Sequence, residues 1–250
     1  MNATLAIPAD GPLFEGHFPG RPILPGISEL VLIARALAPE GDASVAAIPY
    51  VRFRGLVQPA DVLELAARPR EEGGVRFDAR RDGALVANGA ILFGGPAPPH
   101  EGEMAVAARA ARGVPPLEAL IPHRPPMLFV HRLLGEADDG ATCLGRVPHA
   151  CALVTGGVTP TFVALELAAQ TAAVWEAWRR SRTGTGAVRM GYLVSIKDVV
   201  LRRSTIPADA DLFASIRLVV AAPPLTTYAV EVVVEGGLAL SGTIGTYLTD

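Results

Sequence analysis

Two parts of the chain each combine a long apolar run with a following series of strand-like segments. The runs at 27–37 and 160–180 are apolar over several turns, and each predicts a buried helix. The segments that follow alternate in part between apolar and polar positions, which is typical of half-buried strands. We predict strands at 3–8, 45–56, 62–68, 75–80 and 85–93 in the first half, and at 128–134, 141–147, 192–203, 212–220, 228–234 and 238–247 in the second.

Residues 94–116 interrupt this pattern. They are rich in proline and glycine around a middle of alanine and arginine, which predicts a surface linker with room for an exposed helical turn or two. A chain of 250 residues is long enough for two ordinary domains. We therefore predict one domain over 1–95, a linker over 96–116 and a second domain over 117–250.

The two halves also share a short sequence pattern. Val-Arg-Phe-Arg at 51–54 is followed by Pro-Ala-Asp at 59–61, and Val-Val-Leu-Arg at 199–202 is followed by Pro-Ala-Asp at 207–209, at one common offset. This recurrence predicts an internal duplication of a domain-sized unit. The alternative is a tripeptide shared by chance in an alanine-rich chain.

Composition narrows the function. Half of the residues are hydrophobic and the net charge is −3, which gives ample core and no overall footprint for nucleic acid or an anionic membrane. We see no membrane-spanning run and no signal-peptide pattern, so we expect a cytoplasmic protein. Cys143 and Cys151, the only two cysteines, suggest neither a disulfide framework nor a metal site.

Two features carry candidate chemistry. His17 lies in the stretch 14–26, whose prolines and glycines fix a rigid loop that leads into a helix N-terminus. Glu166 is the only charged residue in the apolar stretch 161–174, and Gln170 follows it on the same helix face. A buried carboxyl must be paired or protonated, and burial raises its pKa, which suits a proton donor. From these residues alone, an incidental loop histidine and a structural glutamate remain open alternatives.

The run from Gly16 to Gly26 resembles, over eleven consecutive positions, the signature of the β-hydroxyacyl-carrier-protein dehydratases. This resemblance implies a hotdog fold, an antiparallel sheet wrapped around a central helix, with His17 as catalytic base. The family carries its acidic residue fourteen positions after that histidine, and here the position is Val31. The first half thus supplies half of a site.

The second half supplies the other part. Glu166-Leu167-Ala168-Ala169-Gln170 resembles the family's Glu-x-x-x-Gln helix, which implies that Glu166 is the catalytic acid. The segment 120–128 resembles the family's opening segment, where we expect His123 to shape a proline-rich loop. The sequence around His149 departs from the His-Phe-Pro-Gly pattern, and a site built on His149 and Val31 lacks its acid.

Since hotdog dehydratases form each site across a dimer interface, the resemblance implies an α+β double hotdog with one working centre, His17 with Glu166. This asymmetric pairing most resembles the paired dehydratases of aryl-polyene pathways, which would here be fused in one chain. The implied reaction removes water from a 3-hydroxyacyl thioester carried on the phosphopantetheine of an acyl carrier protein, with no other cofactor and no metal.

Three further residues are expected to bind substrate: an amide near Thr161 as oxyanion donor, Gly26 if the halves exchange roles, and Gln170. An acidic carrier protein needs a basic patch on the protein that it docks to. The alternative interpretation of the basic residues is an ordinary solvated strand face. Rival functions are thioester hydrolysis and a non-catalytic scaffold that binds acyl carrier protein. The patch candidates are Arg21, Arg52, Arg54, Lys197, Arg202 and Arg203.

Overall fold

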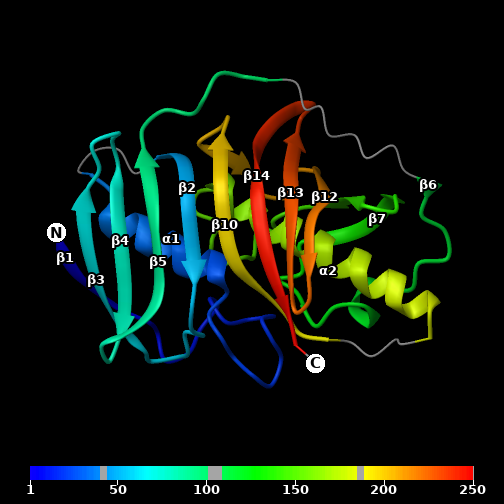
Figure 1. Cartoon of the computed structure of the whole chain (residues 1–250), viewed down its shortest axis with the longest axis horizontal. Coiled ribbons are helices and arrows are strands. Elements are labelled where there is room, and N and C mark those ends of the chain that lie inside the picture. Colours follow the sequence, from blue (N-terminus) through cyan, green and yellow to red (C-terminus); the bar gives the residue numbers. More distant parts are fainter. Residues whose placement is uncertain (40–43, 101–108, 185–188, 250) are drawn as a thin grey trace.

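The computed structural model describes residues 1–39, 44–100, 109–184 and 189–249 (Figure 1). In the first half, every predicted helix and strand is confirmed, with bounds that differ by a few residues. These elements are β1 (Asn2–Ala6), α1 (Gly26–Leu37), β2 (Val45–Phe53), β3 (Val62–Pro69), β4 (Val75–Arg81) and β5 (Ala84–Phe93).

The predicted elements of the second half are confirmed in the same way: β7 (Val130–Glu136), β8 (Gly140–Gly145), α2 (Ala164–Arg182), β10 (Gly191–Leu201), β12 (Leu212–Ala222), β13 (Leu225–Val234) and β14 (Gly237–Leu248). The prediction missed elements that are too short for a periodic pattern to show. These are β6 (Arg109–Ala110), β9 (Val158–Pro160), β11 (Thr205–Pro207) and the 3₁₀ turn η1 (Leu117–Ala119), while the helix predicted over 160–180 begins with the 3₁₀ turn η2 (Thr161–Val163). Most of the linker's alanine- and arginine-rich middle, where a helical turn was expected, lies outside the described residues.

The strand order shows how the halves are related. One half contributes β1-β3-β4-β5-β2 and the other β10-β14-β13-β12-β8, so the two orders mirror each other, and β7 and β6 extend the second half. The halves join where β2 and β10 pair antiparallel, with Val51 opposite Ile196. Each half-sheet curves around one helix, α1 or α2 (Figure 1). This is the predicted α+β double hotdog, and the mirrored order fits an internal duplication.

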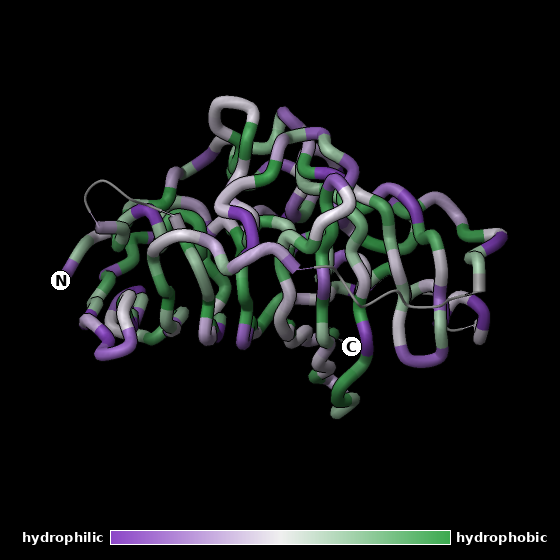
Figure 2. Tube along the Cα trace, turned by 90° about the horizontal axis from the view of Figure 1, so that it is seen from above, coloured by the Kyte–Doolittle hydropathy of each residue, from purple (hydrophilic) through white to green (hydrophobic). Residues whose placement is uncertain are grey.

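A single hydrophobic core runs through both halves. Ile27, Leu30, Ile33 and Leu37 recur at helical spacing on α1 and are almost fully buried. In Figure 2, hydrophobic positions run through the inner parts of the trace, while the most hydrophilic ones lie mostly at turns. Both cysteines are buried and free. Within the described residues, no helix is long and apolar enough to cross a membrane.

Candidate active site

His17 projects from the loop that precedes α1, and its side chain is buried. Its Nδ1 lies 3.2 Å from the carbonyl oxygen of Ile23. Because a carbonyl oxygen only accepts, Nδ1 carries the proton of the neutral ring, and Nε2 keeps a lone pair. Burial, assisted by the nearby His123, lowers the pKa of His17 to about 4. At neutral pH this imidazole is therefore uncharged and ready to accept a proton.

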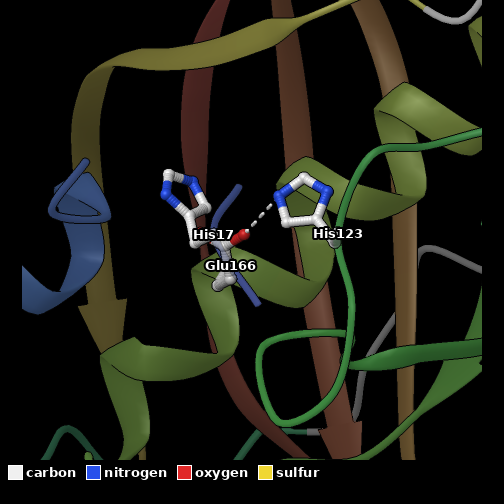
Figure 3. Close-up of side chains that lie close together, drawn as sticks. All are labelled: His17, His123 and Glu166. Carbon is white, nitrogen blue, oxygen red and sulfur yellow. Dashed lines mark ion pairs between the residues drawn. The ribbon is translucent and has the colours of Figure 1, made fainter. Parts of the chain in front are cut away.

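Glu166 lies in the first turn of α2, and Figure 3 shows its carboxyl group between the rings of His17 and His123. Its Oε1 is 3.3 Å from His123 Nε2 and accepts a hydrogen bond of 2.9 Å from Gln170 Nε2. Burial opposes the charged form, but the hydrogen bond and charge of His123 outweigh it, so the pKa of Glu166 is lowered. The expectation that burial raises this pKa is thus corrected: the hydrogen bonds from His123 and Gln170 favour the carboxylate form of Glu166.

His123 is the site residue that the sequence interpretation missed. Its ring centroid lies 5.4 Å from that of His17, its side chain is buried, and its Nδ1 has no hydrogen-bond partner among the described residues. It was expected to shape its loop. The signal that points to it is its place in a second proline-rich loop, 120–128, inside a segment that resembles the same family.

A backbone contact brings the two loops together. The amide of Arg124 donates to the carbonyl oxygen of Gly16 over 3.0 Å, and Gly16 has a φ of +79°. A Cβ on Gly16 would lie 2.0 Å from the carbonyl oxygen of Arg124, so a side chain here is excluded by both conformation and space. This contact fixes His17, one residue later, beside His123, one residue earlier.

Four of the five predicted site residues, His17, Gly26, Glu166 and Gln170, line one cavity of about 80 Å³, which His123 also lines. One atom each of His17, His123 and Glu166 lie within 4.8 Å of one another. Along α2 the cavity follows a single helix face, on which Glu166 is succeeded by Ala169, Gln170, Ala173, Glu176 and Arg180.

The far end of this face leads outward. Glu166 and Arg180 are fourteen residues apart, which is about 21 Å of helix. Around Glu176 and Arg180 the cavity meets a more open groove of about 550 Å³, because Glu176, Arg180, Arg189, Tyr247 and Leu248 line both. A passage therefore leads from the site along α2 to this open groove.

Gln170 is placed differently from its expected role as a substrate ligand. Its Nε2 donates to the carbonyl oxygen of Met127 and to Glu166, and its Oε1 accepts from the amides of Phe129 and Val130. All four hydrogen-bonding positions of the amide are used, which leaves none for a ligand. Gln170 instead holds the carboxyl group of Glu166 in place.

Thr161 also differs from expectation. Its backbone amide donates to the carbonyl oxygen of Ser204 over 3.1 Å, and Thr161 is not among the residues that line the cavity. Its amide is therefore not available to an oxyanion. Gly26 does line the cavity, and as the first residue of α1 its amide has no partner within the helix. Of the two amides considered, that of Gly26 fits the role.

The alternative centre is not assembled. His149 is exposed, and its amide donates to Asp209 Oδ1 over 3.2 Å, whereas Val31 is buried within the core. Neither lines the cavity that contains Glu166. The cluster of His17, His123 and Glu166 has the ligand types that can hold a metal ion.

Comparison with known proteins places this geometry in a family. The family model described as ApeP-like, for the ApeP dehydratase, matches residues 115–250, which is more than half of the chain. The chain belongs to the ApeP-like dehydratase family. A second model, ApeI-like, for the ApeI dehydratase, matches residues 1–90 of the same ApeP-like chain. The two halves thus match the two partners of a dehydratase pair, as the resemblance implied.

Individual relatives of this ApeP-like dehydratase agree. It is 35% identical over 99 residues to the 3-hydroxyacyl-[acyl-carrier-protein] dehydratase FabZ of Caldicellulosiruptor saccharolyticus, a match that spans 33% of this chain and 68% of that protein. The dehydratase heterocomplex ApeI:P from Xenorhabdus doucetiae matches 54% of this chain and 92% of that one, at 21% identity and a TM-score of 0.50. The RzxB dehydratase domain from Pseudomonas fluorescens matches 100% of this chain and 94% of that domain, at 13% identity and a TM-score of 0.72. The structural matches establish the fold.

The substitution His123→Ala is expected to destabilise the dehydratase by about 3 kcal/mol at pH 7, because it leaves the buried Glu166 carboxylate with the hydrogen bond from Gln170 alone. The pKa of Glu166 is lowered by His123, so the stabilisation exists above the carboxyl group's ordinary pKa and is lost as the pH falls through the lowered value. Chemical unfolding from pH 3 to 8 should therefore show a difference that begins to shrink only as the pH falls below the ordinary carboxyl pKa of 4.5. A difference independent of pH would mean that only packing was lost, and His149→Ala is the exposed control.

Proposed function

We propose that this dehydratase removes water from 3-hydroxyacyl thioesters carried on an acyl carrier protein and releases trans-2-enoyl thioesters. The observation that carries the proposal is the pairing in one cavity of an uncharged imidazole, His17, with the carboxyl group of Glu166, which lies 3.3 Å from the ring of a second histidine, His123. The two halves contribute one member each. Dehydration needs a base at C2 and an acid at the C3 oxygen, and this site offers both.

The proposed reaction proceeds as follows. His17 Nε2 takes the C2 proton, and the electron pair left on C2 forms the C2–C3 double bond as the C3–O bond breaks. In the reactive state that we propose, the Glu166–His123 pair carries one proton to give, and the departing hydroxyl takes this proton and leaves as water. The proton now on His17 returns to the Glu166–His123 pair, and their separation of at most 4.8 Å allows one water to carry it.

The negative charge that develops on the thioester oxygen needs a donor. The amide of Gly26 stands at the N-terminus of α1, where the helix dipole favours negative charge. With the thioester oxygen at Gly26, C2 at His17 and C3 at Glu166, the rest of the acyl chain points along α2 towards Glu176 and Arg180. We propose that the acyl chain follows this passage.

The pantetheine arm then enters from the opposite side, where Phe53, Gly55 and Leu56 line the cavity and Leu56 is 38% exposed. Arg52 and Arg54 flank Phe53 and are exposed, which suits an acidic carrier protein. Among the described residues, the side chain of Arg54 bonds only the neutral Asn88, whereas Arg203 pairs with Glu235 and Lys197 with Asp198. Arg52 and Arg54 are therefore the proposed docking contacts.

The test supplies the purified chain with a 3-hydroxyacyl-pantetheine and with a saturated acyl-pantetheine of the same length. The proposal requires enoyl product from the first, detected by mass loss of water, and no free thiol from either. Free thiol without enoyl product would establish hydrolysis instead. Binding without any product would leave the scaffold function.

A further inference from the structure

Glu29 is a buried carboxyl group to which the reaction above assigns no task. It lies in the first turn of α1, its residue is 2% exposed, and its Oε1 has no hydrogen-bond partner among the described residues. It nevertheless lines the same cavity as His17, Gly26 and Glu166. A buried carboxyl group without a partner costs folding free energy. Its presence at a cavity wall therefore indicates that a bound ligand supplies the missing hydrogen-bond partner.

The helix geometry shows which part of the cavity Glu29 serves. Glu29 follows Gly26 by three residues and therefore lies on the same face of α1. Side chains on a helix lean towards its N-terminus, which brings the carboxyl group of Glu29 back towards the turn that begins at Gly26. The amide of Gly26 and the carboxyl group of Glu29 thus converge on the same region.

The protonation state follows from the surroundings. Burial raises the pKa of Glu29 to about 8, and no charged neighbour contributes to this shift. Six ionisable groups besides two tyrosines face the cavity: His17, His123 and Glu166 beside the reacting carbons, and Glu176, Arg180 and Arg189 along and beyond the far passage. At neutral pH, Glu29 is therefore a carboxylic acid with an O–H to donate.

We propose that Glu29 is a catalytic residue that donates its O–H to the thioester oxygen of the substrate, as a second donor beside the amide of Gly26. The inference rests on the proposed function for the identity of the ligand. The proton stays on Glu29 throughout, and the hydrogen bond strengthens as charge develops on the oxygen. A neutral carboxylic acid suits this task because it brings no negative charge to an oxygen that becomes negative.

Two variants separate a donor from a space-filling side chain. Glu29→Met removes the donor and keeps the length of the side chain, and it should lower kcat about 100-fold with little change in KM. Glu29→Gln keeps an N–H donor and should stay within about tenfold of the parent. The parent should lose activity as the pH rises through about 8, because ionised Glu29 no longer donates, and Glu29→Gln should lack this loss. Equal turnover of Glu29→Met and the parent, or an equal loss in both variants, would overturn the proposal.

A second readout does not depend on turnover. A pantetheine ketone, in which CH₂ replaces the thioester sulfur, is bound to each protein, and the infrared stretch of its carbonyl is recorded. A lower frequency in the parent than in Glu29→Met supports the donor, and an identical frequency overturns it. If the parent binds the ketone but forms no enoyl product from 3-hydroxyacyl-pantetheine, the proposed function fails. The carbonyl frequency of the bound ketone still tests Glu29 as a donor in that case. Thermal unfolding checks folding: Glu29→Met should melt above the parent at pH 9, where the buried acid of the parent is ionised.

Discussion

The substitution Glu166→Gln should lower the turnover of 3-hydroxyacyl thioesters about 1,000-fold, while the protein remains folded. An amide cannot pass a proton to the departing hydroxyl, and the loss of one positioned acid costs about 100- to 10,000-fold. The geometry should survive, because the new amide oxygen can still accept from Gln170 Nε2, which now donates to Glu166 over 2.9 Å. Appearance of enoyl product in single-turnover reactions measures the effect.

Glu118→Gln is the matched control for Glu166→Gln. Glu118 is an exposed carboxyl group beside the segment that carries His123, and it does not line the site cavity. Its variant should turn over at the parental rate. Retention of full activity by Glu166→Gln would remove the carboxyl group from the mechanism, whatever the control showed.

The substitution His17→Ala should lower turnover about 1,000- to 10,000-fold, because it deletes the base that takes the C2 proton. The loop should keep its path, since the bond from the amide of Arg124 to the carbonyl oxygen of Gly16 involves backbone atoms only. In the parent, kcat/KM should fall on the acid side as the pH approaches about 4, where the ring becomes protonated and ceases to be a base. Exchange of the C2 proton of substrate with deuterated solvent is the direct measurement, and His17→Ala should abolish it.

His149→Ala tests the choice of centre. His149 is exposed and lines no part of the cavity around Glu166, so its variant should keep most of the parental activity. If His149→Ala destroys turnover and His17→Ala does not, the working centre has been assigned to the wrong histidine.

The long elements and the half-site residues could be predicted from the sequence because their signals are local. Long apolar runs marked α1 and α2, and the proline- and glycine-rich loop marked His17. Contacts between distant segments carry no such signal. That His123 meets Glu166 depends on Arg124 bonding Gly16, more than a hundred residues away. The amide of Thr161 donates to Ser204, and the side chain of Gln170 bonds Met127 and the amides of Phe129 and Val130. The sequence next to Thr161 and Gln170 gives no sign of these bonds.

Because β2 and β10 pair at the centre of the sheet, each half without the other would have an unpaired strand edge there. A half expressed alone would present an open row of backbone donors and acceptors, which invites aggregation. Covalent fusion keeps β2 and β10 close to each other in every molecule. Their effective concentration therefore does not depend on the concentration of a separate partner protein. The tether thus protects solubility and keeps the two halves at a one-to-one ratio.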